Sequence, residues 1–237
     1  LGANTLRGRE AIPGAERYGF MAIAAIHHGP GKLCEKEQSP APAAFRREMD
    51  QYLYIVDCLA PHAVASPNTL ILQVGNEQVS GPEPWAKRLG DIRPFERLDV
   101  LLAHCRNRVK PLAPALPLGY SNCAFGYCVP GFLDVYCHNT YLSHDRHWPP
   151  LEEFIALQNR SPRPYVHTEF GANVYMPQAY VGAANSPVLE KIHAWNYPNR
   201  WRTYQAAGAC GGACYCLYDY DPATVTRDSW DRGFTNF

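Results

Sequence analysis

Thr69-Leu-Ile-Leu-Gln-Val-Gly-Asn-Glu77 is an apolar run that ends on a carboxylate, and Pro164-Tyr-Val-His-Thr-Glu-Phe-Gly171 repeats this arrangement further along the chain. Short apolar runs bounded by turn residues are typical of buried strands in a parallel sheet. In a parallel α/β barrel every strand ends at the same rim, so residues far apart in sequence can face each other across its mouth. The two runs therefore predict a barrel whose rim carries Glu77 and Glu169.

Two carboxyl groups at one rim meet the main chemical requirement of glycoside hydrolysis. One protonates the leaving oxygen, and the other attacks or stabilises the oxocarbenium-like centre. Glu77 and Glu169 fit these two roles. An alternative stays open for Glu77, because Asn and Glu are also favoured where a strand gives way to a helix.

Further apolar runs alternate with segments of helical composition, which is the pattern of an α/β fold. The expected strands are Ala3–Leu6, Phe20–Ile26, Leu70–Val74, Leu116–Tyr120, Leu133–Cys137, Tyr165–His167 and Ala213–Tyr218. The expected helices are Ala43–Leu59, Phe95–Val109, Leu151–Gln158 and Val188–Ala207. The first helix is expected to stop at Pro61, and the crossover from Gly8 to Gly19 has room for only one or two helical turns.

The length of the chain fits one barrel, since 237 residues compare with roughly 250 in a typical (β/α)8 TIM barrel. No linker, fixed repeat or low-complexity tract divides it. We therefore expect a single domain over residues 1–237 with an α/β fold. Seven strands are readable, one fewer than in a closed barrel, so the barrel is expected to be incomplete.

The composition excludes several classes of partner. Basic and acidic residues balance at 22 each, so no long-range field favours nucleic acid or an anionic membrane surface. No apolar run has the roughly 20 residues of a membrane span, which predicts a soluble protein. A neutral partner such as a carbohydrate fits this balance, whereas the oligomeric state is left open.

The cysteines say little about function. Nine is an odd number, so at least one is unpaired within the chain. No two Cys-x-x-Cys motifs support a zinc site. Cys210, Cys214 and Cys216 lie in a Gly/Ala-rich strand, where cysteine acts as a small buried hydrophobe. Reduced thiols slightly favour the cytoplasm.

Four motifs occur in the order seen in clan A glycoside hydrolases: Leu1-Gly-Ala-Asn-Thr-Leu-Arg7, Val74-Gly-Asn-Glu77, Asp134-Val-Tyr-Cys-His-Asn-Thr-Tyr141 and Thr168-Glu-Phe-Gly171. The chain most resembles the TIM-barrel catalytic domain of glycoside hydrolase family 2, which includes β-galactosidases, β-glucuronidases and β-mannosidases. The resemblance runs to about Tyr220. Each motif alone is weak, but their combination at the fourth, sixth and seventh barrel strands is specific.

The resemblance implies a role for each matching residue. Glu77 corresponds to the acid/base, with Asn76 beside it to bond the sugar 2-hydroxyl. Glu169 corresponds to the nucleophile of a retaining enzyme. Tyr141 resembles the tyrosine that contacts the nucleophile, and Arg7 resembles the arginine beneath it, whose charge keeps the carboxylate ionised. Such a mechanism needs no metal or organic cofactor.

Further residues are candidates for binding the sugar. His27 and His28 end the third strand, where relatives often have a site histidine, although for either residue taken alone a structural role, one buried and one exposed, is favoured. Asn139 belongs to the Asn-x-Tyr motif of the sixth strand. Trp85 and Trp148 lie in loops and could stack on a sugar ring. Tyr215 stands where the family usually has a tryptophan.

Other residues have less specific expectations. Strand parity places His167 on the same face as Glu169, and therefore in the barrel interior. His138 either contributes to the pocket or points outward beside Asn139. Trp195 and Trp201 are expected to be packing residues of the helix that follows the seventh strand.

The resemblance also shows departures from the family. The first barrel strand and the preceding β-sandwich domains are absent, so the chain is expected to be a fragment or a reduced relative. This supports an alternative to hydrolysis, in which an inactive or weak barrel binds carbohydrate or serves as a structural module. A cysteine hydrolase using Cys137 and His138 ranks last, because adjacent strand residues point to opposite faces.

Overall fold

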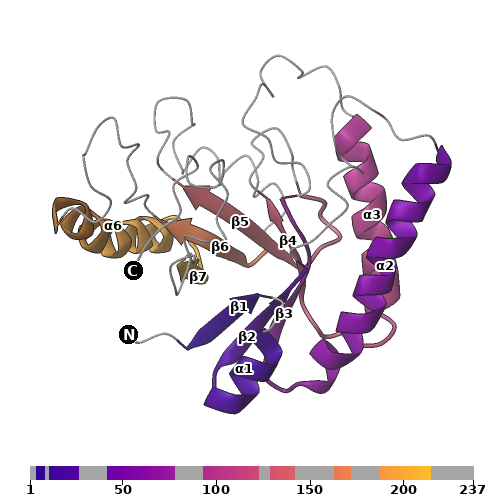
Figure 1. The fold of residues 1–237 in the computed structure, drawn as a ribbon, viewed down its shortest axis with the longest axis horizontal. Helices are drawn as coiled ribbons and strands as arrows, with labels where there is room; N and C mark the ends of the chain where they lie inside the picture. Colours follow the sequence, from indigo (N-terminus) through magenta and orange to yellow (C-terminus); the bar gives the residue numbers. More distant parts are fainter. Residues whose placement is uncertain are drawn as a thin grey trace. The chain divides into compact units, whose positions relative to one another are not determined.

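The computed structural model describes residues 4–8, 11–26, 42–77, 93–122, 129–141, 163–171 and 187–214. Seven strands follow one another in the sheet in chain order (Figure 1). They are β1 (Thr5–Gly8), β2 (Met21–Ala25), β3 (Thr69–Asn76), β4 (Leu118–Asn122), β5 (Val135–Tyr141), β6 (Tyr165–Gly171) and β7 (Gly211–Cys214). The helices are α1 (Ala11–Tyr18), α2 (Pro42–Ala65), α3 (Arg93–Val109) and α6 (Pro187–Ala206). This succession of parallel strands and helices confirms an incomplete α/β TIM-barrel fold.

The chain divides into two compact units. The first comprises residues 1–138 and 156–164, and the second comprises residues 139–155 and 165–237. The strand pairs described within these units are all parallel. Each unit is described on its own below.

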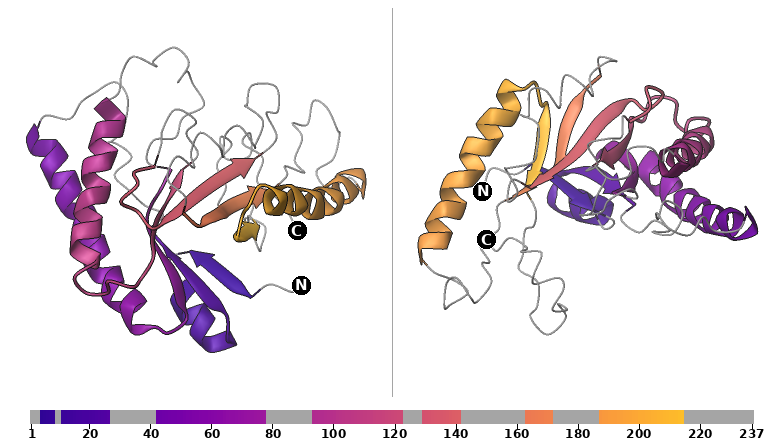
Figure 2. Two further views of the ribbon diagram at one scale, coloured as in Figure 1. Left: turned by 180° about the vertical axis from the view of Figure 1, so that it is seen from behind. Right: turned by 90° about the horizontal axis from the view of Figure 1, so that it is seen from above.

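The first unit holds β1 to β4 and the start of β5. Figure 2 shows α2 and α3 side by side along one flank of this unit. The helix α2 packs on β3, where the Tyr52 hydroxyl donates to the Val74 carbonyl oxygen at 2.7 Å. An ion pair between Arg108 and Asp57 joins α3 to α2. The short helix α1 has eight residues, which confirms the brief first crossover expected from the sequence.

The helix α2 does not stop at Pro61, so that prediction was wrong. Proline lacks the N–H that would bond to the carbonyl one turn earlier, which costs roughly 3 kcal/mol in a helix interior. Here Pro61 is exposed, whereas Ala60 and Ala63 beside it are buried and continue the apolar face. Because this packing continues past the proline, the helix runs on to Ala65.

The second unit is built around an aromatic cluster between β6, β7 and α6. Phe170 stacks on Trp201 and meets Tyr204 edge to face, with ring centroids 6.4 and 5.3 Å apart. A Cβ atom on Gly212 would lie 2.8 Å from the Trp201 ring, so β7 approaches α6 only because this residue is glycine. Trp201 is a packing residue as expected, but Trp195 is 68% exposed, so that expectation was wrong.

The described cysteines differ in environment. Cys105 and Cys137 are buried, whereas Cys58 and Cys210 are exposed. Burial raises the pKa of the Cys105 thiol to about 12, which makes it unreactive at neutral pH. The expectation of a buried hydrophobe was therefore wrong for Cys210, whose thiol bonds to the Tyr165 carbonyl oxygen at 3.1 Å.

None of the helices in the described ranges is both long enough and apolar enough to cross a bilayer.

Candidate active site

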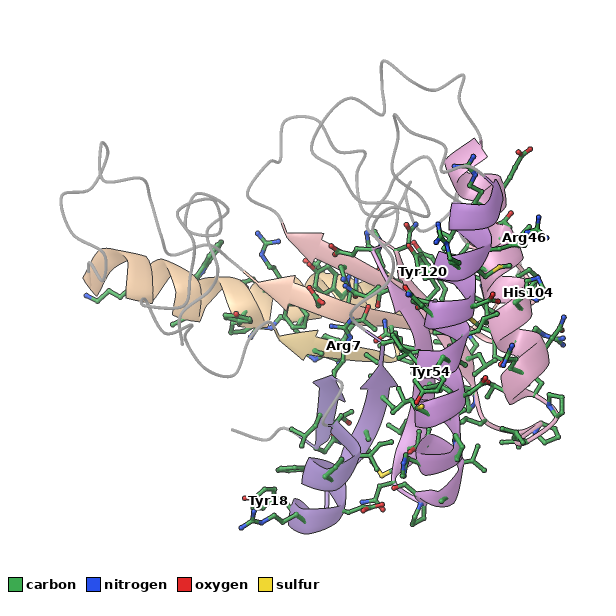
Figure 3. The ribbon with its side chains drawn as sticks, turned by 45° about the vertical axis from the view of Figure 1, so that its right-hand side comes forward. Arg7, Tyr18, Arg46, Tyr54, His104 and Tyr120 are labelled. Atoms are coloured by element: carbon green, nitrogen blue, oxygen red, sulfur yellow. The ribbon has the colours of Figure 1, made fainter. Side chains whose placement is uncertain are left out.

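Arg7 is the centre of a polar network at the ends of β1, β3 and β4. Figure 3 labels it on β1. Its Nε atom donates to Gln73 Oε1 at 2.7 Å, and its Nη2 atom donates to Asn76 Oδ1 at 2.6 Å and to Ser121 Oγ at 3.3 Å. These contacts join residues more than sixty positions apart in sequence. The guanidinium is therefore held in a fixed plane against the carboxyl end of β3.

An irregularity in β3 makes this network geometrically feasible. Along a regular strand, residues three apart point to opposite faces. The pairing of β3 with β4 shifts register between Gln73 and Asn76, as at a β-bulge. Both side-chain oxygens consequently reach the same guanidinium, and Asn76 is fixed immediately before Glu77.

Glu77 has a strained backbone. Its φ angle is +54°, and no other non-glycine residue in the described ranges has a positive φ. Its N–H donates to the Ser121 carbonyl oxygen at 3.0 Å, which holds the residue in this left-handed conformation. Such a conformation costs on the order of 1–3 kcal/mol and is concentrated at functional sites. The strain therefore marks Glu77 as a functional candidate independently of any sequence motif.

Glu169 lies on β6 in the second unit and is 7% exposed. The neighbouring Thr168 hydroxyl donates to Asn139 Oδ1 at 2.8 Å, which ties β6 to the end of β5. Asn139 is itself buried. The structure thus brings Asn139 beside the strand segment that carries Glu169.

His167 is not placed as strand parity predicted. Its ring stacks on Tyr204 of α6, with centroids 3.5 Å apart, and its Nε2 atom is bonded to the Tyr165 hydroxyl. It therefore packs against the helix. The pairing of β6 with β7 shifts register between His167 and Phe170, so both of these residues contact α6 although they are three positions apart. The prediction that His167 lies in the barrel interior was wrong because it assumed a regular strand.

His138 is buried, with 1% exposure, and its ring stacks on that of Tyr136 at 6.1 Å. Burial lowers the pKa of His138 to about 3, against an opposing effect of a hydrogen bond with the Asn122 backbone. A neutral, enclosed imidazole has little access to a sugar. The packing role is therefore favoured over the pocket role.

His138 is expected to make the stability of the protein depend on pH. Its folded pKa lies below the value of about 6.5 in an unfolded chain, so acidification protonates the unfolded chain first and stability falls from pH 6.5 towards pH 3. Between pH 7 and pH 5 the free energy of unfolding should fall by about 2 kcal/mol. Urea unfolding at both pH values measures it, with His138→Gln as the control. An equal loss in the control would contradict this assignment.

Some predicted site residues lie outside the described ranges. His28, Trp85, Trp148 and Tyr215 are among them, as is the helix expected at 151–158. Tyr141 is the last residue of β5, and only its backbone is described. These predictions stay predictions.

Gln73 and Ser121 are members of the network that sequence reasoning missed. A usable signal existed for Gln73, because it is the one polar side chain within the otherwise apolar run from Leu70 to Val74. Ser121 carries no such signal, since serine after a glycine-containing strand is typical of a turn. Across the described ranges, no group of three His, Cys, Asp or Glu residues could hold a metal ion.

Comparison with known proteins shows similarity of fold without close similarity of sequence. No family model and no curated protein matches the chain. A β-glucuronidase from an uncultured Clostridium sp. has a TM-score of 0.64 and 15% identity, with 92% of this chain and 38% of that chain covered. A β-D-glucuronidase for Dictyoglomus thermophilum has a TM-score of 0.65 and 16% identity, with 92% of this chain and 39% of that chain covered.

A third solved structure is a β-glucuronidase from Ruminococcus gnavus in complex with D-glucuronic acid. Its TM-score is 0.59 at 15% identity, with 92% of this chain and 38% of that chain covered. The chain thus spans about two fifths of the length of these proteins. Its incomplete TIM-barrel fold is similar to the part of these β-glucuronidases that it covers.

Proposed function

We propose that residues 1–237 form the catalytic domain of a retaining O-glycoside hydrolase acting on β-linked sugars, with Glu169 as the nucleophile and Glu77 as the acid/base. The observation that carries this proposal is the strained φ of Glu77, directly after an asparagine fixed by Arg7. The buried position of Glu169 beside the Thr168–Asn139 bond adds support.

The proposed reaction is a double displacement. Glu169 attacks the anomeric carbon while Glu77 gives its proton to the departing oxygen, so that a C–O bond to the enzyme replaces the glycosidic bond. Glu77, now a carboxylate, then takes a proton from water, and the resulting oxygen nucleophile displaces Glu169 from the sugar. Two inversions at one carbon return the starting configuration.

The first unit supplies the support for the acid/base. Asn76 Oδ1 accepts from Arg7, which fixes the orientation of the amide. The amide NH₂ group is then the part of Asn76 that we assign to the sugar 2-hydroxyl. Arg7 itself is assigned to the substrate-binding residues.

The remaining binding roles are proposals of the same kind. Asn139, Tyr141 and His28 are assigned to the sugar pocket. Trp85, Trp148 and Tyr215 are assigned to stacking against the ring. The substrate is a carbohydrate, with neither nucleic acid nor a membrane as a partner. The D-glucuronic acid bound by the Ruminococcus gnavus enzyme makes β-glucuronides the first substrates to test.

A panel of p-nitrophenyl β-D-glycosides tests the proposal, covering the glucuronide, galactoside, glucoside and mannoside, with the α-anomers as controls. We expect release of p-nitrophenol from at least one β-glycoside, and proton NMR should show the β-anomer of the free sugar first. The activity should survive EDTA, because neither displacement uses a metal. An α-anomer formed first would mean inversion. Binding of the sugars without turnover would replace the proposal by the carbohydrate-binding alternative.

A further inference from the structure

Gln73 is an amide within the apolar part of β3. It is fully buried, as are Leu72 and Val74 on either side. Its Oε1 atom accepts from Arg7 Nε at 2.7 Å. A guanidinium can only donate, so the amide oxygen must face Arg7 and the Nε2 atom must face away. Within the described structure, that Nε2 atom is buried without a hydrogen-bond partner.

A buried amide N–H that makes no hydrogen bond costs about 1–3 kcal/mol. An apolar side chain of the same length would avoid this cost. Stability of the fold therefore does not explain a glutamine at this position. The contact that does distinguish glutamine from an apolar residue is the bond to Arg7.

We propose that Gln73 is a positioning residue that orients the Arg7 guanidinium so that it can hold Asn76 beside Glu77. This inference rests on the proposed function. Gln73 engages Nε and Asn76 engages Nη2, two donors of one planar, rigid group. The bond at Nε adds a further fixed point in the plane of the guanidinium to the bonds that Nη2 makes to Asn76 and Ser121. The register shift in β3 is what brings both acceptors to the same side.

Two substitutions separate positioning from packing. Gln73→Met keeps the length of the side chain and removes the acceptor, whereas Gln73→Glu keeps an acceptor oxygen for Arg7 Nε. We expect Gln73→Met to lower kcat about 10- to 100-fold with KM changed less than about threefold, which is the scale of one hydrogen bond to a charged group. Gln73→Glu should recover most of the loss. Gln51→Met, at an exposed position of α2, is the matched control.

The melting temperature distinguishes a role of Gln73 in positioning Arg7 from a role in packing the core. Gln73→Met removes the orphan donor as well as the acceptor, so its melting temperature should stay within about 4 °C of the wild type. Loss of kcat together with a collapse of the melting temperature, not rescued by Gln73→Glu, would overturn the proposal. So would full activity in Gln73→Met.

A second readout does not depend on turnover. The Arg7 Nε–H resonance in a ¹⁵N-correlated NMR spectrum is identified by its loss in Arg7→Lys. Gln73→Met should shift this resonance and accelerate its exchange with solvent at least tenfold, while Gln51→Met leaves it in place. An unchanged resonance would overturn the positioning role. A wild-type chain that cleaves no glycoside would instead count against the proposed function, and the NMR result would still decide the role of Gln73.

Discussion

Replacing Glu169 by glutamine is expected to lower kcat/KM by roughly 10⁵-fold, the scale on which the loss of a catalytic nucleophile acts. The amide has nearly the same shape as the carboxylate but cannot form the glycosyl ester. Because Glu169 is 7% exposed and lies on a paired strand, the isosteric change should leave the fold intact. Steady-state kinetics on the best substrate of the panel measure the effect. Glu16→Gln, an exposed position of α1, is the control.

Added azide extends this test. In Glu169→Ala, whose short side chain leaves room for a small anion, azide can attack the anomeric carbon from the face that the carboxylate would have used, while Glu77 still protonates the leaving oxygen. The product should therefore be the α-glycosyl azide, formed by a single inversion. Wild-type rates in Glu169→Gln, or a β-azide product, would remove Glu169 from the nucleophile role.

Replacing Glu77 by glutamine is expected to have an effect that depends on the leaving group. General acid catalysis contributes on the order of 10²–10⁴-fold, but only where the departing oxygen needs a proton. An alkyl β-glycoside should therefore lose about 10³-fold in turnover, whereas a 2,4-dinitrophenyl β-glycoside, whose phenolate leaves without protonation, should lose less than tenfold in the first step. Parallel kinetics on the two substrates measure the difference.

In Glu77→Gln, added azide should give a product of the opposite anomeric configuration. Glu169 is still present, so the glycosyl ester forms and azide then displaces it, which yields the β-glycosyl azide. Equal losses on both substrates would contradict the acid role and indicate that Glu77 acts through the local backbone instead. Because the φ angle of Glu77 is +54°, an effect through the backbone has to be distinguished from the acid role of its side chain. Glutamine is chosen because it keeps the length of the side chain at this strained position.

The sequence predicts the strands well where burial makes them apolar and less well where polar side chains extend them. The expected strand 70–74 continues to Asn76, and the expected strand 165–167 continues to Gly171. Apart from Phe170, the extra residues are polar or small, and backbone pairing with the neighbouring strand keeps them extended. A prediction from the apolar pattern alone cannot include this backbone pairing, so it ends each strand too early.

The two register shifts explain most of what the sequence could not predict in the site. Period-two alternation assigns faces correctly only in a regular strand. The shift in β3 brings Gln73 and Asn76 to one guanidinium, and the shift in β6 turns His167 towards α6. The strain at Glu77 is likewise invisible in the sequence, because it depends on the bond from its N–H to Ser121 on another strand.

Trapping the covalent intermediate tests the central claim most directly. A 2-deoxy-2-fluoro-β-glycosyl fluoride of the preferred sugar should inactivate the protein. The fluorine at C2 slows both formation and hydrolysis of the glycosyl ester, whereas the reactive fluoride leaving group speeds formation alone, so the ester accumulates. Mass spectrometry of the digested protein should then place the fluorosugar on Glu169, and Glu169→Gln should remain unlabelled. A label on Glu77 or on any other residue, or turnover with no label at all, would contradict the proposed mechanism.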